Sequence, residues 1–423
     1  MGSTSRRLVV IGQGYVGLPL AMRAVQVGYD VVGLEIDKAR VEQLKAGESY
    51  VEDVPSADLH AALAAGRYTP TADVSEIDGF DVAVITVPTP LRESVPDLSH
   101  IETAARMLAP ALQQGAVVIL ESTTYPGTTE ELLVPLLEAG SGLHMGTDVL
   151  VGYSPERIDP GNKTWTFVNT PKVVSGVNAE SLAAVDAFYS DLVAQTVPVS
   201  TPKEAELTKL LENTFRHVNV ALVNELAMFA GELGIDVWEA IDAASTKPFG
   251  FMPFRPGPGV GGHCLPVDPS YLSWQVRRSL GESFRFVELA NDVNAHMPSY
   301  VVRRLTRSLN DRRLPVKGTR VLVLGLAYKK NTSDARESPA VNVTLLLAGL
   351  GADVRAADPH VDASLLEGVV QRVAFTAEEV AAADAVVLLT EHDAFDAGVV
   401  VEHAKYVFDC RNALPAGPSV ECL

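Results

Sequence analysis

The chain has few cysteines and few basic residues for its length of 423 residues. Cys264, Cys410 and Cys422 are odd in number and far apart, which does not fit a disulfide framework and favours a reducing compartment such as the cytoplasm. Lys and Arg total 34 against 53 Asp and Glu, which gives a formal net charge of −19. Nucleic acids and anionic membranes need a basic surface, so neither is expected as a partner.

Long apolar runs are also missing. Near the N-terminus an apolar run of about five residues ends at the first glycines, which is too short for the core of a signal peptide. No uninterrupted apolar stretch reaches the roughly 18–20 residues of a membrane helix. The sequence therefore predicts a soluble protein. Its length exceeds the roughly 250–300 residues of a single core, so two or three domains are expected.

The first half of the chain alternates strand-like and helix-like segments, which is typical of a parallel sheet with helices on both faces. We place this first α/β domain at residues 1–199. A helix is expected over Tyr15–Val27, and the expected strands are Leu8–Gly12, Asp30–Leu34, Val82–Val87, Ala116–Leu120, Val149–Gly152 and Lys172–Ser175.

The middle of the chain has helical spacing of its apolar residues. Long helices are expected over Lys203–Leu233 and Phe286–Leu309, separated by a Pro- and Gly-rich loop over residues 249–269. This predicts a helical domain at 200–315. Strand-helix alternation then resumes, which predicts a second, smaller α/β domain at 316–423. Its expected elements are strand Arg320–Leu326, helix Pro339–Leu350, and strands Asp353–Ala357, Asp384–Leu389 and Tyr406–Phe408.

A GxGxxG motif at Gly12–Gly17 follows the first strand and opens the first helix. Glycines in this pattern allow a tight turn, close approach of a pyrophosphate and close packing of helix on strand. Glu35, 18 residues after Gly17, stands where an acid accepts hydrogen bonds from a ribose and repels a 2′-phosphate, so NAD is favoured over NADP. The alternatives are a purely structural glycine turn and a ribose role for Asp37, which falls beyond the strand end.

Cys264 stands in the glycine- and proline-rich loop, with Asp268 four residues later. A thiol with open backbone around it suits a nucleophile that attacks a carbonyl, and the alternative is a small buried apolar side chain. His263 has no CxxC or HxxxH partner pattern, so no metal is expected. Cys410 and Cys422 have no comparable surroundings and are interpreted as structural.

Glu206, Lys209 and Asn213 share one face of the long helix, because their spacing is i, i+3 and i+7. Lys209 beside the Asn213 amide is suited to polarise an oxygen or to hold a water. A solvated helix face is the alternative, and His217 on the same face is more typical of a structural histidine.

Together these motifs resemble the nucleotide-sugar 6-dehydrogenase family, which includes UDP-glucose and GDP-mannose dehydrogenases. The resemblance covers nearly the whole chain in order and spacing. It rests on GQGYVGLPLA (12–21), VPTP (87–90), ESTTYPGTT (121–129), YSPERIDPGN (153–162), AELTKLLEN (205–213), GPGVGGHCLPVDP (257–269) and AYKKNTSDARESPA (327–340).

The resemblance implies two Rossmann-like doubly wound domains joined by a helical domain, whose long helix also forms a homodimer or a higher homo-oligomer. The N-terminal domain would bind NAD and the C-terminal domain the UDP-sugar. It also implies a four-electron oxidation of the C6 hydroxyl with two NAD⁺ per sugar, through a thiohemiacetal and a thioester on Cys264.

Site residues follow from the matching motifs. The catalytic set is Cys264 as nucleophile, Asp268 as acid/base or water-positioning group, Lys209 and Asn213 for oxyanions and water, and Thr123 and Glu156 for the hydrolytic water. The cofactor set is Gly12, Gly14, Tyr15, Val16, Gly17, Glu35, Thr89, Thr123 and Arg336. The substrate set is Glu156, Arg157, Lys209, Asn213, Arg255, Gly261 and Lys329.

Two details separate the chain from UDP-glucose enzymes: PERIDPGN replaces a PEF-type motif, and His263 stands where Ser or Tyr is usual. The segment around the cysteine is closer to the branch acting on UDP-N-acetylglucosamine, which makes the uronate for surface polysaccharides. UDP-glucose and UDP-N-acetylmannosamine are alternative substrates. Rival functions are a single-step hydroxyacid or 6-phosphogluconate-type dehydrogenase, which lacks the cysteine, and a non-catalytic NAD-binding regulator.

Overall fold

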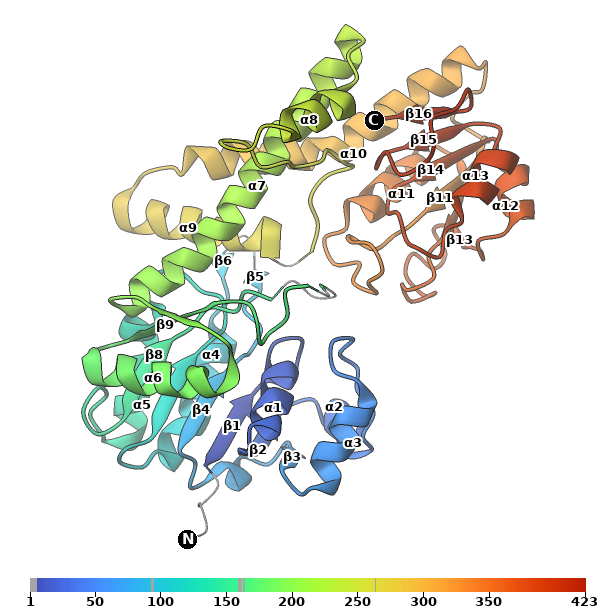
Figure 1. The fold of residues 1–423 in the computed structure, drawn as a ribbon. Coiled ribbons are helices and arrows are strands. Elements are labelled where there is room, and N and C mark those ends of the chain that lie inside the picture. Colours follow the sequence, from blue (N-terminus) through green and yellow to red (C-terminus); the bar gives the residue numbers. More distant parts are fainter. Residues whose placement is uncertain (1–5, 93–94, 159–161, 163, 263) are drawn as a thin grey trace. The chain divides into compact units, whose positions relative to one another are not determined.

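The computed structural model describes residues 6–92, 95–158, 162, 164–262 and 264–423 (Figure 1). His263 lies outside the described residues, as does the side chain of Cys264. The chain divides into two compact units. Unit 1 comprises Met1–Glu212 and Trp274–Leu280, and unit 2 comprises Asn213–Ser273 and Gly281–Leu423. Each unit is described by itself.

Unit 1 contains a sheet in the order β10-β9-β8-β7-β4-β1-β2-β3. Its neighbouring strands are parallel, except that β9 runs antiparallel to β8, so the predicted parallel sheet is in fact mixed. The expected strands are present within one or two residues of their predicted ends, whereas β3 and β10 were not predicted. The strands are β1 (Arg7–Ile11), β2 (Asp30–Leu34), β3 (Tyr68–Thr71), β4 (Val82–Ile85), β7 (Val117–Leu120), β8 (Leu150–Tyr153), β9 (Lys172–Gly176) and β10 (Thr196–Pro198).

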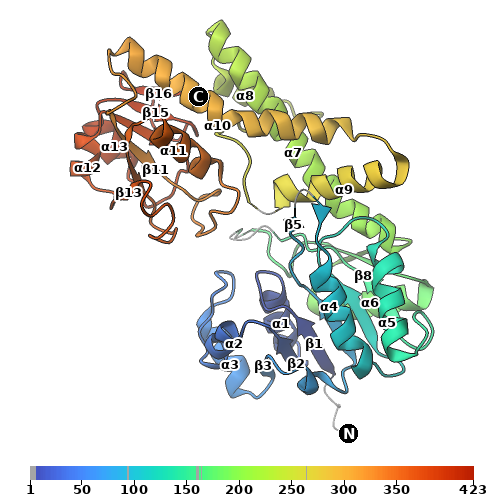
Figure 2. The ribbon, with the colours of Figure 1, turned by 180° about the vertical axis from the view of Figure 1, so that it is seen from behind.

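Both faces of this sheet are buried, as the alternation of β1 shows. Leu8 and Val10 join one apolar core, while Val9 and Ile11 join the other. Helices α1 (Gly17–Gln26), α2 (Lys38–Lys45), α3 (Ser56–Ala64) and α6 (Ala179–Leu192) contribute to the first core, and α4 (Ser99–Leu108) and α5 (Val134–Ser141) contribute to the second (Figures 1 and 2). Short elements complete the unit: β5 (Leu91–Arg92), β6 (Val95–Pro96), η1 (Val74–Ile77), η2 (Ala109–Ala111) and η3 (Thr129–Leu133).

Unit 2 contains a second sheet, in the order β13-β12-β11-β14-β15-β16, with all neighbours parallel. This confirms the second Rossmann-like fold. The strands are β11 (Arg320–Leu324), β12 (Asp353–Ala357), β13 (Gln371–Arg372), β14 (Ala385–Leu388), β15 (Val407–Asp409) and β16 (Val420–Cys422). Its helices are α11 (Pro339–Gly349), α12 (Ala377–Ala382) and α13 (Ala397–His403).

Four helices occupy the middle of the chain: α7 (Pro202–Leu233), α8 (Val237–Ser245), α9 (Cys264–Leu280) and α10 (Arg285–Asp311). The division into units falls within α7 and within α9. The long helix predicted over residues 203–233 is confirmed. The predicted loop over 249–269 is wrong in its last part, because α9 already begins at Cys264 and contains Pro269. Pro269 is the sixth residue of α9, beyond the first turn, so it costs the helix one main-chain hydrogen bond.

Among the residues that the structure describes, no helix is both long enough and apolar enough to cross a membrane.

Candidate active site

The glycine motif forms the turn between β1 and α1, where the strand order of the first sheet changes direction. Gly12 has φ +92°, and a Cβ on Gly17 would lie 1.9 Å from the Gly12 carbonyl oxygen. At Gly14, in contrast, a Cβ would meet no atom within 4 Å. Gly12 is therefore needed for the backbone conformation of the turn, and Gly17 for the close packing of α1 on it. Gly14 leaves the open space that a pyrophosphate would need.

Glu35 follows β2 directly and is 6% exposed. Its carboxylate accepts hydrogen bonds from the backbone N–H of Gln13 and of Asp37, each at 3.1 Å. Asp37 is the N-cap of α2, where its carboxylate accepts from the N–H groups of Ala39 and Arg40. Glu35 is thus fixed beside the glycine turn, whereas Asp37 is engaged in capping. The ribose role of Glu35 stays a prediction that this arrangement supports.

Thr89 and Thr123 come from neighbouring loops of unit 1, after β4 and β7. The Thr89 hydroxyl donates to the Thr123 carbonyl oxygen at 2.8 Å, and Ser122 donates to the Val87 carbonyl oxygen at 2.7 Å. Both loops follow carboxyl ends of parallel strands, the edge at which ligands bind in open α/β sheets. Tyr15, on the glycine turn, is 44% exposed.

A buried cluster of charged side chains lies at the same edge of unit 1. Glu121 follows β7, and Glu156 comes shortly after β8. Lys172 opens β9, and because β9 runs antiparallel to β8 its first residue falls at that edge. The Lys172 ammonium contacts the Glu121 carboxylate and lies 3.1 Å from Glu156 Oε2. Lys209 of α7 donates a hydrogen bond to the main-chain carbonyl oxygen of Glu156.

The pKa values of the two carboxylates in the cluster shift in opposite directions. Burial raises the pKa of Glu121 above its ordinary value, against the attraction of Lys172. Burial also acts to raise the pKa of Glu156, but Lys172, a hydrogen bond with Glu121 and the charge of Lys209 together lower it. The pKa of Glu156 therefore lies below that of Glu121.

The buried face of α7 carries the polar residues that the sequence placed together. Glu206, Lys209, Asn213 and His217 are all 8% exposed or less, so the alternative of a solvated face is wrong. Glu206 accepts from the backbone N–H of Gly127 at 2.5 Å and of Thr129 at 2.9 Å, which holds the loop after β7 against the helix. Burial raises the pKa of Glu206 to about 7.

Asn213 and Asp268 meet within unit 2. The Asn213 amide donates to Asp268 Oδ2 at 2.5 Å, and Asp268 is 1% exposed. Asp268 lies in the first turns of α9, one helical turn after Cys264. The structure thus joins two of the predicted catalytic residues.

The glycine-rich segment before α9 packs tightly within unit 2. A Cβ on Gly261 would lie 2.8 Å from the Glu337 carbonyl oxygen and from Tyr328 Cβ. Gly262 donates its N–H to the Arg336 carbonyl oxygen at 3.1 Å. Gly257 donates its N–H to the Asn224 side chain of α7 at 2.9 Å. Gly261 therefore has a packing reason in addition to its predicted substrate role.

The arginines and the lysine that were predicted to contact ligands differ in their partners and in their burial. Arg157 forms an ion pair with Glu212 and donates to the Pro171 carbonyl oxygen at 2.7 Å, all within unit 1. In unit 2, the exposed Arg255 pairs with Asp242, and Arg336 pairs with Asp334 through two hydrogen bonds of 2.9 and 2.6 Å. Lys329 is half-buried in the loop after β11. The ligand roles of these four residues stay predictions.

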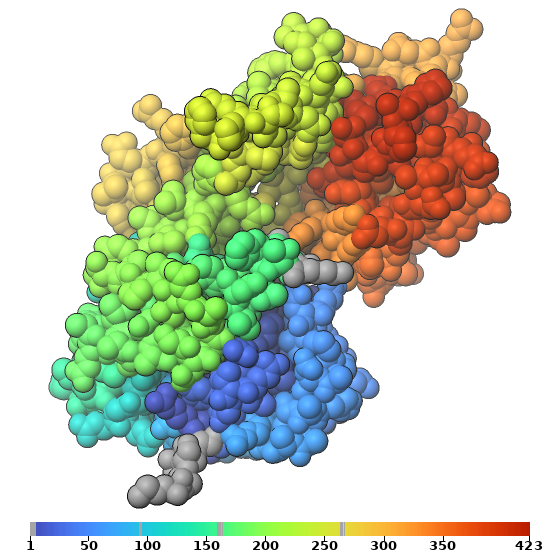
Figure 3. Space-filling model, viewed as in Figure 1, coloured from blue at the N-terminus to red at the C-terminus, as the bar shows by residue number. Residues whose placement is uncertain are grey.

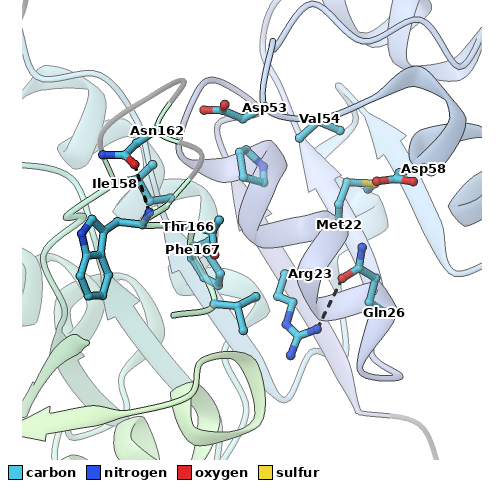
Figure 4. Close-up of a pocket in the computed structure, with 13 residues that line it drawn as sticks. Met22, Arg23, Gln26, Asp53, Val54, Asp58, Ile158, Asn162, Thr166 and Phe167 are labelled. Atoms are coloured by element: carbon cyan, nitrogen blue, oxygen red, sulfur yellow. Dashed lines mark hydrogen bonds between the residues drawn. The ribbon is translucent and has the colours of Figure 1, made fainter. Parts of the chain in front are cut away.

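A separate pocket of about 210 Å³ lies in unit 1 beside α1 (Figure 4). Arg23 and Gln26 of α1 face it from one side, and Thr166 and Phe167 face it from the other. None of the predicted site residues is among the described residues lining it. This pocket is therefore distinct from the predicted site.

Sequence reasoning missed Glu121, Lys172 and Tyr189 as members of the buried cluster. Glu121 was visible only as part of a motif, although a charged residue that directly follows an apolar strand is a usable signal. Lys172 gave none, because its position at the ligand-binding edge depends on the direction of β9.

Comparison with known proteins gives matches along the whole chain. Residues 6–193 match the NAD binding domain of the UDP-glucose/GDP-mannose dehydrogenase family, 203–296 its central domain and 322–416 its UDP binding domain. UDP-N-acetyl-D-mannosamine dehydrogenase of Pyrococcus horikoshii is 36% identical over 422 residues, 97% of each chain. UDP-N-acetyl-D-glucosamine 6-dehydrogenase of Pseudomonas aeruginosa is 40% identical over 361 residues, 84% of this chain and 83% of that protein. The solved structure of the P. horikoshii UDP-D-ManNAc dehydrogenase superposes with a TM-score of 0.89 at 34% identity, covering 98% of each chain.

Proposed function

The chain belongs to the UDP-glucose/GDP-mannose dehydrogenase family, and we propose that it oxidises the C6 hydroxyl of UDP-N-acetylglucosamine to a carboxylate. The protein is thus an NAD-dependent dehydrogenase, and the choice of sugar is the proposed part. The observation that carries the choice of sugar is the 40% identity to UDP-N-acetyl-D-glucosamine 6-dehydrogenase of Pseudomonas aeruginosa. The oxidation itself is supported by the buried polar face of α7, where Lys209 donates to the Glu156 carbonyl oxygen and Asn213 donates to Asp268. We also propose the three-part division at 1–199, 200–315 and 316–423, with NAD, helical and UDP-sugar domains in that order.

The residues of the glycine turn fit NAD. The open space at Gly14 admits a pyrophosphate at the N-terminus of α1, and the fixed Glu35 carboxylate suits two ribose hydroxyls. We assign Gly12, Gly14, Tyr15, Val16 and Gly17 to this contact, with Thr89 and Thr123 in the adjoining loops and Arg336 as an additional contact. When bound, NAD⁺ supplies the acceptor for a hydride from C6.

The proposed chemistry has two oxidations on one carbon. C6 first loses a hydride and the hydroxyl loses a proton, which gives an aldehyde. The Cys264 thiolate then forms a C–S bond to C6 and the oxygen takes up a proton, giving a thiohemiacetal. Loss of a second hydride and of that proton gives a thioester. Water breaks the C–S bond, which yields the carboxylate, the thiolate and two protons.

Each proposed role uses a feature of the residue concerned. A thiol at a helix N-terminus is favoured as thiolate, and α9 begins at Cys264. Lys209 supplies a cation for the oxyanion at each stage, since a buried ammonium interacts strongly with developing charge. Asn213 and the Asp268 carboxylate orient the hydrolytic water, with Thr123 and Glu156 completing its surroundings. Arg157, Arg255, Gly261 and Lys329 are proposed substrate contacts.

A specific observation favours UDP-N-acetylmannosamine as the second candidate substrate. The P. horikoshii relative, named for that sugar, matches 97% of this chain, a larger share than the relative named for UDP-N-acetylglucosamine. UDP-glucose is the third candidate.

A panel of these three UDP-sugars and GDP-mannose, read by NADH absorbance, tests the proposal. We expect kcat/KM for UDP-N-acetylglucosamine to exceed the others by about tenfold or more. A site that hydrogen-bonds an equatorial N-acetyl group rejects UDP-glucose and GDP-mannose, which lack the group, and disfavours UDP-N-acetylmannosamine, whose N-acetyl group at C2 is axial. A preference for UDP-N-acetylmannosamine would replace the sugar assignment. Tight NAD binding without turnover on any member would favour a non-catalytic regulator.

Removing the thiol tests the nucleophile. Cys264→Ala should lower carboxylate formation by about three orders of magnitude or more, as expected for loss of a covalent nucleophile. Cys410→Ala is the matched control: Cys410 is fully buried in unit 2, so this change should lower stability while the folded enzyme keeps its turnover. Full uronate production by Cys264→Ala would contradict the assignment.

We further propose that the long helix α7 forms a homodimer. One face of the helix exposes an apolar stripe with spacings of three, four or seven residues. In Figure 3 the helix is coloured from green to yellow-green and reaches the surface. The stripe consists of Leu207, Leu211, Phe215, Leu222, Leu226, Phe229 and Leu233. Sedimentation should give a dimer for the natural chain and a monomer for Leu226→Glu, and a natural chain that sediments as a monomer would contradict it.

A cytoplasmic location is proposed on the free thiols of Cys410 and Cys422.

A further inference from the structure

The charged cluster at the edge of the first sheet contains two residues without a role in the proposed chemistry. Lys172 is 4% exposed and Glu121 is 1% exposed. Removing charges from water is costly, and a buried ion pair often contributes less stability than apolar residues of the same volume. A buried pair beside a ligand-binding edge therefore calls for a reason other than stability.

Both oxygens of the Glu156 side chain have partners within unit 1. Oε1 accepts a hydrogen bond from the Ile158 N–H at 2.5 Å, and Oε2 faces the Lys172 ammonium at 3.1 Å. The main-chain carbonyl oxygen of the same residue accepts from Lys209. The position of the Lys209 ammonium thus depends on the main chain around Glu156 and Ile158, called here the Glu156 turn. The position of that turn depends on Lys172.

Lys172 is itself held from several sides. Its ammonium contacts the Glu121 carboxylate, and it lies 5.6 Å from the centre of the Phe167 ring and 5.2 Å from that of Tyr189. The Tyr189 hydroxyl donates to Glu121 Oε2 at 2.8 Å. The chain of contacts therefore runs from α6 through β7 and β9 to the loop after β8 and on to α7, all within unit 1.

We propose that Lys172 and Glu121 are positioning residues for the dehydrogenase reaction: together they hold the Glu156 turn so that its carbonyl fixes the Lys209 ammonium. This inference rests on the proposed function, in which Lys209 stabilises the oxyanions. Neither residue touches the substrate in this role. Their effect should appear in kcat, with little change in the KM for NAD.

The charges around Lys172 determine how its removal acts. The titratable groups that face it are Glu121 after β7, Glu156 after β8 and Tyr189 from α6. Lys209 from α7 acts on Glu156. In Lys172→Met the two buried carboxylates lose their shared cation. At low pH they can share one proton and stay together, but at higher pH both ionise and repel each other. The Glu156 turn should then move, and with it Lys209.

The experiment measures kcat against pH at saturating UDP-sugar and NAD for the natural enzyme, Lys172→Met and Lys172→Met/Glu121→Gln. We expect the alkaline limb of Lys172→Met to move to lower pH, with kcat reduced about tenfold or more above roughly pH 8, since small displacements of a catalytic group are costly. Adding Glu121→Gln removes the repelling charge, so the limb should return toward that of the natural enzyme. Circular dichroism over the same pH range confirms that each variant is folded during the assay.

Val173→Ala is the matched control, because Val173 is the next residue of β9 and packs into the core on the other face of the strand. It should lower the melting temperature and leave the pH profile of kcat unchanged. A Lys172→Met profile that parallels that of the natural enzyme, or a double variant without recovery, would overturn the positioning role.

If Lys172→Met does not accumulate as folded protein, the single variant Glu121→Gln tests the positioning role. It leaves one ionised carboxylate beside Lys172 and should lower kcat roughly fivefold with unchanged KM for NAD, as expected for a weakened hydrogen bond. An unchanged kcat would overturn the proposal. Failure of the proposed function is recognised separately, because the natural enzyme would then oxidise none of the UDP-sugars.

Discussion

The two sheets of the molecule share a strand order but differ at the loops where ligands bind. In unit 1 the core order is β3-β2-β1-β4-β7-β8, and in unit 2 it is β13-β12-β11-β14-β15-β16. In both, the first strand lies beside the second on one side and the fourth on the other, which is the dinucleotide-binding arrangement. The fold alone therefore does not distinguish a dinucleotide site from a site of another kind.

The first loops differ in length and chemistry. After β1 the chain turns through three glycines into α1, which begins at Gly17. After β11 only Gly325 remains, and residues 326–338, with two lysines and an arginine, precede α11. A short glycine turn brings a helix N-terminus to a pyrophosphate, whereas a longer loop with lysine and arginine side chains can hold phosphates through those side chains.

The acids after the second strands differ in what they bind. Glu35 accepts two backbone N–H groups beside the open turn. The Asp358 side chain is fully buried, accepts from the N–H groups of Leu326 and Ala327, and pairs with His392 at 3.0 Å. The Asp358 carboxylate holds its own loop, whereas Glu35 is the acid for which we propose a ligand. The predictions below test this difference, beginning with the largest effect.

Asp358→Asn should destabilise unit 2 by about 3–5 kcal/mol, because it removes the buried negative charge that accepts four backbone N–H groups and turns an amide N–H toward these donors. NAD affinity should not change. Urea unfolding and NAD titration measure the two quantities. Asp362→Asn, on an exposed neighbouring carboxylate, is the control, with a much smaller loss. A loss of NAD affinity in Asp358→Asn would contradict the proposed difference between Glu35 and Asp358.

Asp358 should also make the stability of unit 2 depend on pH. Burial acts to raise the pKa of Asp358, but the His392 hydrogen bond and the backbone N–H groups hold it below the ordinary value of 3.8. Its charge therefore stabilises the folded state above pH 3.8, and this contribution is lost as pH falls through the lower folded pKa. The stability difference between the natural chain and Asp358→Asn should shrink accordingly in acid.

Gly17→Ala should weaken NAD binding about a hundredfold or more, because the added methyl group would lie 1.9 Å from the Gly12 carbonyl oxygen and must displace the turn. Gly349→Ala in α11 is the matched control, since its Cβ meets open space. It should be neutral or raise stability by about 0.5–1 kcal/mol. Equal NAD affinity for Gly17→Ala and the natural chain would contradict the assignment of the turn.

Glu35→Ala should weaken NAD binding about tenfold or more, the effect of losing a charge-assisted hydrogen bond to ribose. Isothermal titration with NAD measures it. Unchanged affinity would move the ribose role to Asp37.

Asp37→Ala should have the smallest effect. It removes the N-cap of α2 and should cost about 1 kcal/mol of stability without changing NAD affinity. Thermal unfolding together with the same titration separates the two, and a tenfold loss of affinity would favour Asp37 over Glu35.

Much of this comparison could be predicted from the sequence. The glycine turn with Glu35 and the shared face of Lys209 and Asn213 follow from spacing, because strand and helix periodicities are local properties. Both Rossmann-like sheets also followed from alternating apolar segments. β3 escaped prediction because Pro70 interrupts it, and proline is tolerated there since β3 is an edge strand.

The remainder depends on tertiary structure. Nothing local in the residues around Lys172 indicates that β9 runs antiparallel, so its place beside Glu121 and Glu156 was not predictable. The prolines of the cysteine segment argued for a loop up to Pro269, whereas α9 begins at Cys264 and contains Pro269 despite the main-chain hydrogen bond that this proline costs. The contact between Asn213 and Asp268 likewise joins residues far apart in sequence.

The most direct test of the account is the number of NADH molecules formed for each UDP-sugar consumed by the natural enzyme, measured by absorbance against chromatographic quantification of the product. Two NADH for each uronate, with no free aldehyde accumulating, is the predicted result, because a tethered intermediate undergoes both oxidations. One NADH for each sugar, with an aldehyde or ketone as the final product, would contradict it.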